Sequence, residues 1–202
     1  MTGTHTMITR PRFSALHRAS VATCALFTLF SAVAADTTGK AARDRIERGR
    51  YLVTTGGCND CHTPFKMGAN GPEPDMSRML SGHPEQLVMP PVPKLPEGPW
   101  MMVSAATNTA HAGPWGVSFS ANLTPDASGL GDWSAEQFKQ TIRSGRHLGR
   151  GRPVLPPMPI PAYRNFTDAD LLAIYSYLRT VPAVANRVPE PLPPAPALAA
   201  GR

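Results

Sequence analysis

Two cysteines and a histidine in the first third of the chain are the residues whose types and spacing point most directly to chemistry. They stand in Cys58-Asn59-Asp60-Cys61-His62, which reads C-x-x-C-H. Thiols three positions apart lie on one turn of backbone, so each can form a thioether with one haem vinyl group. The histidine that follows is held under the macrocycle, where it can bind the iron. The motif predicts one covalently attached haem c, bound by Cys58, Cys61 and His62.

Three other uses of this cysteine pair fit the sequence less well. A thioredoxin-type redox dithiol belongs in a βαβ context, and no such context is visible here. A structural zinc site needs four Cys or His ligands, but no cysteine follows Cys61 and the later histidines are scattered singly. A disulfide between Cys58 and Cys61 would close a very small, strained loop. We therefore favour the haem interpretation.

A second axial ligand for the iron is expected from a methionine in the C-terminal third. Met158 lies in the segment from Leu155 to Pro161, and prolines on both sides fix φ and remove N–H donors. Such a stiff loop can hold a weak Fe–S bond at little ordering cost, and a thioether ligand raises the reduction potential. We predict that His62 and Met158 are the metal ligands. The rival candidates are Met67, Met76, Met79, Met89, Met101, Met102, His83, His111 and His147.

Three helices are predicted to position these residues. A segment over residues 41–55 leads directly into the motif, with apolar residues near helical spacing. A second helix begins after Ser134, which forms a capping box with the glutamine three positions later, and ends at Gly145. A third begins after Thr167, has acidic residues in its first turn and presents a broad apolar face.

Between the first two helices lies a long stretch rich in Pro, Gly and Met, residues 64–120. Prolines this dense disfavour long helices and central strands. An insertion of this length in a compact domain is more often a functional cover or a partner surface than an idle loop. We therefore expect an irregular insertion and interpret it as a docking surface.

The N-terminal residues 1–35 have the pattern of an export signal. A region with three arginines and no acid precedes an apolar run over residues 21–30 and then small residues. The apolar run is shorter than the roughly 20 residues that cross a bilayer. Cleavage near Ala34 or Ala35 would release the protein into the periplasm and remove Cys24.

The remainder reads as one domain, residues 36–187, followed by a Pro- and Ala-rich tail, residues 188–202, that we expect to be disordered. The full chain has 20 basic and 14 acidic residues; without the three arginines of the signal it has 17 and 14, a net charge of +3. This mildly basic balance suits docking on an acidic partner. A nucleic-acid partner is not expected, because no basic helix or recognisable nucleic-acid module is present.

Taken together, the order of elements resembles the class I c-type cytochromes. The resemblance is narrower to the exported single-haem cytochromes and cytochrome subunits that accompany bacterial dehydrogenases, and it covers about residues 46–189 apart from the insertion. The segments that carry it are GRYLV at 49–53, GGCNDCHTP at 56–64, NLTPD at 122–126, GLGDWS at 129–134, PPMP at 156–159 and TDADL at 167–171. It implies an all-α, cytochrome c-like helical domain around one haem. The first and last helices would cross at Gly49, and Trp133 would bind a haem propionate.

The function that this resemblance implies is electron transfer and not substrate chemistry. The partners would be a dehydrogenase as electron donor and a cytochrome or oxidase as acceptor, with peripheral association with a membrane complex left open. Two alternatives remain. One is a haem-based peroxidase or gas sensor with an open or labile sixth iron position, and the other is a subunit that mainly holds a larger complex together.

Overall fold

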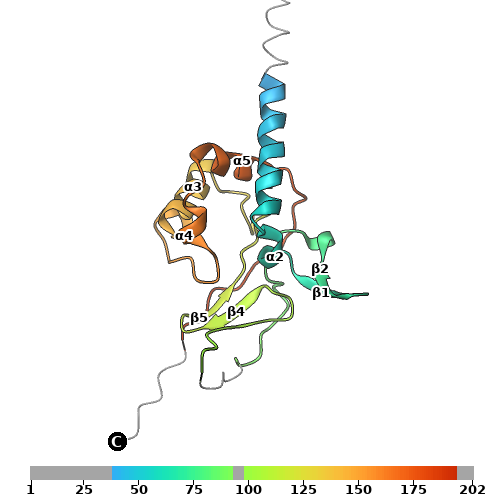
Figure 1. Ribbon diagram of the computed structural model, residues 1–202, viewed down its shortest axis with the longest axis vertical. Coiled ribbons are helices and arrows are strands. Elements are labelled where there is room, and N and C mark those ends of the chain that lie inside the picture. The colour runs from blue at the N-terminus through green and yellow to red at the C-terminus, as the bar shows by residue number, and fades with distance from the viewer. Residues whose placement is uncertain (1–37, 93–97, 195–202) are drawn as a thin grey trace, which may run out of the picture. The chain divides into compact units, whose positions relative to one another are not determined.

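The computed structural model describes residues 38–92 and 98–194, and its chain divides into two units, Met1–Arg43 and Asp44–Arg202 (Figure 1). Residues 38–43 of the first unit are helical. The predicted export signal, with Cys24 and the cleavage positions Ala34 and Ala35, lies outside the described residues. Within those residues, no helix is long and apolar enough to cross a membrane. The C-x-x-C-H motif and the elements around it belong to the second unit.

The three predicted helices are present. Residues 44–55 are helical, and the further helices are α2 (Cys58–His62), α3 (Ala135–Ser144), α4 (Ile160–Tyr163) and α5 (Asp168–Leu178), with short 3-10 turns at η1 (Met76–Arg78) and η2 (His147–Gly149). The Ser134 side chain accepts from the N–H of Gln137, and the Gln137 side chain accepts from the N–H of Ser134, which confirms the capping box. Gly145 ends α3 at φ +66°, and Thr167 caps α5.

The insertion differs from the prediction because it contains two antiparallel sheets. One is the hairpin of β1 (Phe65–Gly68) and β2 (Gly71–Pro74). The other has the order β3 (Val103–Ser104), β4 (Ala110–Gly113) and β5 (Gly116–Phe119), with β4 and β5 side by side in Figure 1. The cytochrome c-like expectation was therefore wrong in one respect, since the domain is not all-α.

Strands form in this proline-rich insertion because they are short and the prolines fall at positions that strands tolerate. Each has only two to four residues, and the prolines of β2 lie in a two-stranded hairpin, where a strand edge tolerates a missing N–H. The strands β4 and β5 contain no proline at all. Other described prolines of the insertion, Pro84, Pro90, Pro91 and Pro99, lie outside the paired strands.

One apolar core lies where the helices meet. Its buried members are Leu52, Val53, Leu80, Leu130, Phe138, Ile142, Ile160, Leu171, Ile174, Leu178 and Val181. The crossing expected at Gly49 is confirmed: a Cβ added there would lie 2.0 Å from the Ala173 carbonyl oxygen of α5. Tyr51 is 57% exposed and does not pack into this crossing.

The chain after α5 returns across the insertion. The buried Asn186 donates from Nδ2 to the carbonyls of Ser81 and His83, at 2.7 and 2.9 Å. Leu192 pairs with Val117 on the edge of β5 through two backbone hydrogen bonds of 2.9 Å. Leu192, within the predicted tail of residues 188–202, is therefore paired with the sheet of the insertion.

Candidate functional site

The C-x-x-C-H motif forms a single helical turn, α2, whose position is fixed at both ends. Gly57 at φ +68° turns the chain from the preceding helix into α2. After the turn, Thr63 donates its hydroxyl to Asn59 at 2.8 Å and accepts from the N–H of Leu80 at 2.8 Å. The N–H of Gly82 donates to the His62 carbonyl at 2.8 Å. The turn is thus held by the chain that follows it.

Cys58 and Cys61 are free thiols, both partly buried, and their spacing puts them on one side of the turn. Burial raises the pKa of the Cys58 thiol to about 11, with a further contribution from the Asp60 charge. The pKa of Cys61 is also raised, by burial and by Asp60. Both thiols are therefore protonated at neutral pH before any covalent attachment.

The His62 ring is oriented by a backbone carbonyl. Its Nδ1 lies 2.7 Å from the carbonyl oxygen of Ala121, which can only accept, so Nδ1 carries the proton. The Nε2 lone pair is left for a metal, as is usual for a ligating histidine. Burial lowers the pKa of His62, which favours the neutral ring that an iron ligand needs.

Met158 lies in a loop that is joined to the residues just before the cysteines. Its side chain is partly buried against the same apolar core as Cys58. Two residues further on, Ile160 is buried in that core, and the Tyr163 hydroxyl donates to the carbonyl of Gly56. The structure therefore connects the loop that contains Met158 to the turn that contains the C-x-x-C-H motif.

Most of the rival methionines are at the surface. Four of them are exposed: Met67, Met76, Met101 and Met102. Met89 is partly exposed. Met79 is the rival that, like Met158, is partly buried against the core.

The rival histidines differ in how their ring nitrogens are used. Both nitrogens of His83 are engaged, by Thr109 and by the Leu87 carbonyl, each at 3.0 Å. His111 bonds Ser104 through Nδ1 at 2.9 Å, while its buried Nε2 has no hydrogen-bond partner among the described residues. His111 also lies near enough to His62 to contribute to lowering that residue's pKa. It is therefore the strongest histidine alternative to Met158.

Trp133 is partly buried against the core and lies just before the Ser134 cap of α3. Its carbonyl accepts from the Tyr175 hydroxyl at 2.6 Å, and its ring meets His147 edge-on, with centroids 5.0 Å apart. The contact between Trp133 and a propionate stays a prediction.

These residues fit a covalently bound haem on the chemistry of their donor atoms. Two thiols on one turn, a histidine with a free Nε2 and a methionine in a braced loop are the groups that the cofactor needs. In the part of the chain that the structure describes, no three His, Cys, Asp or Glu side chains gather as a metal site. Sequence reasoning did not find Ala121 or Tyr163, because their roles come from tertiary contacts that leave no local signal.

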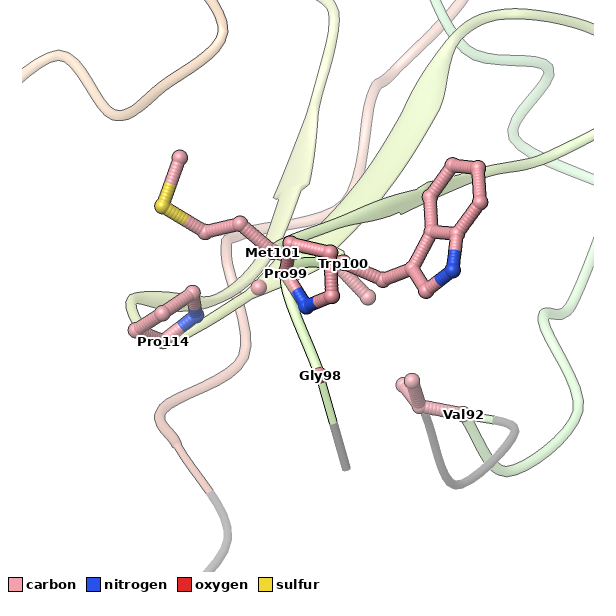
Figure 2. A pocket seen from close by; sticks show the side chains of 8 residues that line it. Val92, Gly98, Pro99, Trp100, Met101 and Pro114 are labelled. Carbon is pink, nitrogen blue, oxygen red and sulfur yellow. The ribbon is translucent and has the colours of Figure 1, made fainter. Parts of the chain in front are cut away.

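A shallow open pocket lies elsewhere, on the insertion. Figure 2 shows Trp100, Met101, Pro114 and Val92 around it, and none of its lining residues belongs to the C-x-x-C-H turn. The side chains of Trp100 and Met101 are 71% and 65% exposed. This pocket is therefore a surface feature separate from the candidate haem site.

Comparison with known proteins gives a consistent result. Residues 46–182 match the family model described as Cytochrome c. The chain is 30% identical over 146 residues to a nicotinate dehydrogenase subunit of Pseudomonas putida, with 71% of this chain and 9% of that protein covered. It is 28% identical over 145 residues to the fructose dehydrogenase cytochrome subunit of Gluconobacter japonicus, with 71% and 23% covered.

A third relative is the gluconate 2-dehydrogenase cytochrome c subunit of Pantoea cypripedii, 29% identical over 149 residues, with 73% of this chain and 25% of that protein covered. The chain thus spans a quarter or less of the length of these relatives.

Proposed function

The chain belongs to the cytochrome c family, and we propose that it is a periplasmic electron carrier with a single haem c whose iron is bound by His62 and Met158. Membership in the family makes it an electron-transfer protein with covalently bound haem c. The observation that supports His62 most directly is the hydrogen bond from its Nδ1 to Ala121, which leaves Nε2 for the iron. The braced, partly buried Met158 supports the second ligand.

The bound haem supplies one-electron chemistry, and the protein sets where that electron can go. Cys58 and Cys61 would hold the macrocycle on α2, and the neutral ring of His62, oriented by Ala121, would offer the iron a nitrogen ligand. A thioether from Met158 favours the reduced iron and raises the potential. If His62 and Met158 both hold the iron, they would leave it no open position for a substrate, which suits a carrier.

The partners that we propose follow from the relatives. Two of these are named as cytochrome subunits, of a fructose and a gluconate dehydrogenase, and the third as a subunit of a nicotinate dehydrogenase. We propose that a dehydrogenase reduces this protein and that a downstream cytochrome or an oxidase accepts the electron.

The surface for the dehydrogenase is proposed to be the group of exposed apolar side chains between residues 87 and 102 of the insertion, here named the apolar rim. Its members are Leu87, Val88, Val92, Trp100, Met101 and Met102, all exposed. This narrows the expectation that the whole insertion docks a partner, because β4 and β5 are buried parts of the domain. An apolar rim rich in Trp and Met is the composition that protein interfaces favour.

The optical spectrum of the purified protein tests the ligand assignment. We expect a six-coordinate, low-spin spectrum with the far-red sulfur-to-iron band, and loss of that band in Met158→Ala. Met67→Ala is the matched control, because Met67 is 78% exposed and its loss should leave the band unchanged. A band that survives in Met158→Ala would rule Met158 out. A high-spin, five-coordinate wild type would favour the peroxidase or gas-sensor alternative.

Reduction kinetics test the apolar rim. In the double variant Trp100→Ser, Met101→Ser, we expect slower haem reduction by a dehydrogenase-containing extract of the source cells supplied with gluconate, fructose or nicotinate. Reduction by ascorbate, which needs no docking surface, should proceed at the wild-type rate. Equal rates with the extract for variant and wild type would remove the rim from the proposal.

A further inference from the structure

The loop around Met158 has few backbone N–H donors of its own. From Leu155 to Pro161, four of seven residues are prolines, so only Leu155, Met158 and Ile160 have an N–H. One of these is used locally, since the N–H of Ile160 donates to the Met158 carbonyl at 2.9 Å. The Pro159 carbonyl accepts from the N–H groups of Ala162 and Tyr163 just after it, whereas the Pro156 carbonyl accepts from a different element.

Ser118 of β5 supplies such a donor. Its Oγ lies 2.6 Å from the carbonyl oxygen of Pro156 and 3.3 Å from that of His111. A hydroxyl has one proton, and the shorter contact identifies Pro156 as its acceptor. Ser118 is only 7% exposed, so water cannot readily replace it.

The same stretch of chain also reaches the other proposed ligand. Ala121, three residues after Ser118, presents its carbonyl to His62 Nδ1 at 2.7 Å. In extended backbone, three residues span about 10 Å. Residues 118–121 therefore contact both segments that would hold the iron, through the Ser118 hydroxyl and the Ala121 carbonyl.

We propose that Ser118 is a positioning residue that holds the Met158 loop on the iron, so that one short segment of the insertion fixes both axial ligands. The inference rests on the proposed function, because it requires Met158 to be a ligand. It gives the β4–β5 hairpin a role in the redox site in place of the irregular cover that the sequence suggested. By pairing the Pro156 carbonyl, Ser118 would oppose any movement of the loop that replaces Met158 with another ligand.

Titration of the ferric protein with imidazole tests this role. Imidazole competes for the sixth position, and we expect Ser118→Ala to be half-converted at about one tenth of the imidazole concentration that the wild type needs, because a buried acceptor is left unpaired. Ser118→Thr keeps the hydroxyl and should stay close to the wild type. If Ser118→Thr binds imidazole as readily as Ser118→Ala, packing and not the hydrogen bond is responsible, and the proposal is wrong.

Ser104→Ala is the matched control. Ser104 belongs to the same sheet, but its hydroxyl bonds His111 and not the Met158 loop, so its imidazole affinity should be that of the wild type. A tenfold change in this control too would show general loosening and overturn the proposal.

The Met158→Ala spectrum separates the two levels of inference. If the far-red band survives in Met158→Ala, the proposed ligation fails and the role of Ser118 fails with it. If the band is lost there while Ser118→Ala binds imidazole like the wild type, the ligation stands and only the role of Ser118 is overturned.

Discussion

At the scale of single residues, the site depends on groups that place other groups. The Ala121 carbonyl sets the tautomer of His62, and the Ser118 hydroxyl pairs a carbonyl of the Met158 loop. Because Gly49 has no side chain, the backbone of α5 can lie where a Cβ would otherwise be. Each of these roles is visible only when the neighbouring element is present.

We predict that Gly49→Ala strongly destabilises the protein. The new methyl would lie 2.0 Å from the Ala173 carbonyl oxygen and 2.8 Å from the Cβ of Tyr177, so the two helices must separate. Overpacking of this kind costs about 1–3 kcal/mol or more. The urea midpoint of the haem-loaded protein measures the loss.

Gly39→Ala is the control for this substitution. An added Cβ at Gly39 meets its nearest atom at 3.4 Å, which is ordinary contact, and alanine is the better helix former. We expect its midpoint to equal or slightly exceed that of the wild type. Equal midpoints for Gly49→Ala and Gly39→Ala would show that the helices do not cross closely at Gly49.

At the scale of elements, the sequence predicted the structures that depend on local signals and missed those that depend on non-local pairing. The capping box at Ser134, the glycine at Gly145 and the cap at Thr167 each satisfy helix ends within a few residues, so the sequence alone located α3 and α5. Strand pairing joins residues that local periodicity does not connect, and strands of two to four residues show no alternation to read. For this reason β1 to β5 were missed.

In the candidate site, too, the local motif was predictable from the sequence and the long-range contacts were not. C-x-x-C-H is a local motif, so Cys58, Cys61 and His62 could be predicted from the sequence. The contacts made by Ser118 and Tyr163 join residues 38 and 107 positions apart. Nothing in the neighbouring sequence marks either residue, and only the folded chain brings them to the site.

Asp168, in the first turn of α5, gives a prediction for how the stability of the protein depends on pH. Hydrogen bonds from Arg143 and then Lys139 of α3 lower the pKa of Asp168. The pKa of Asp168 is therefore lower in the folded than in the unfolded protein. The stabilisation that its bonds to Arg143 and Lys139 give the folded protein is complete above the unfolded pKa near 4, and it is lost as pH falls through the folded pKa. We expect the urea midpoint of the wild type to exceed that of Asp168→Asn by a small amount at pH 6, and the two to converge toward pH 2.

Salt provides the control for the Asp168 experiment. Because the Asp168 side chain is 66% exposed, 0.5 M NaCl should shrink the difference between wild type and Asp168→Asn at pH 6. A difference that persists at pH 2, or that grows in salt, would contradict the electrostatic origin.

At the scale of the whole molecule, the segment after the region that matches the family packs back onto the insertion. The family match ends at residue 182, yet the following segment crosses the insertion and pairs with β5. Asn186 is 2% exposed, and its amide joins the Ser81 and His83 carbonyls while it accepts from the N–H of Glu85 at 2.9 Å. The side chain of Asn122 holds the same segment through the Val184 carbonyl at 2.8 Å. The segment thus connects the insertion to the helical part of the domain.

Truncation separates the two attachments of this C-terminal segment. A chain that ends at Pro194 keeps both and should unfold at the wild-type urea midpoint. A chain that ends at Arg187 loses the pairing of Leu192 with Val117. Its free energy of unfolding should fall by about 1 kcal/mol, because two backbone hydrogen bonds are removed at an exposed edge.

A chain that ends at Pro182 also loses Asn186 and leaves the Ser81 and His83 carbonyls unpaired. Its free energy of unfolding should fall by about 3 kcal/mol or more. Asn186→Ala in the full chain should reproduce most of that last step. Equal midpoints for the chains ending at Pro182 and Pro194 would show that the segment lies on the domain without stabilising it.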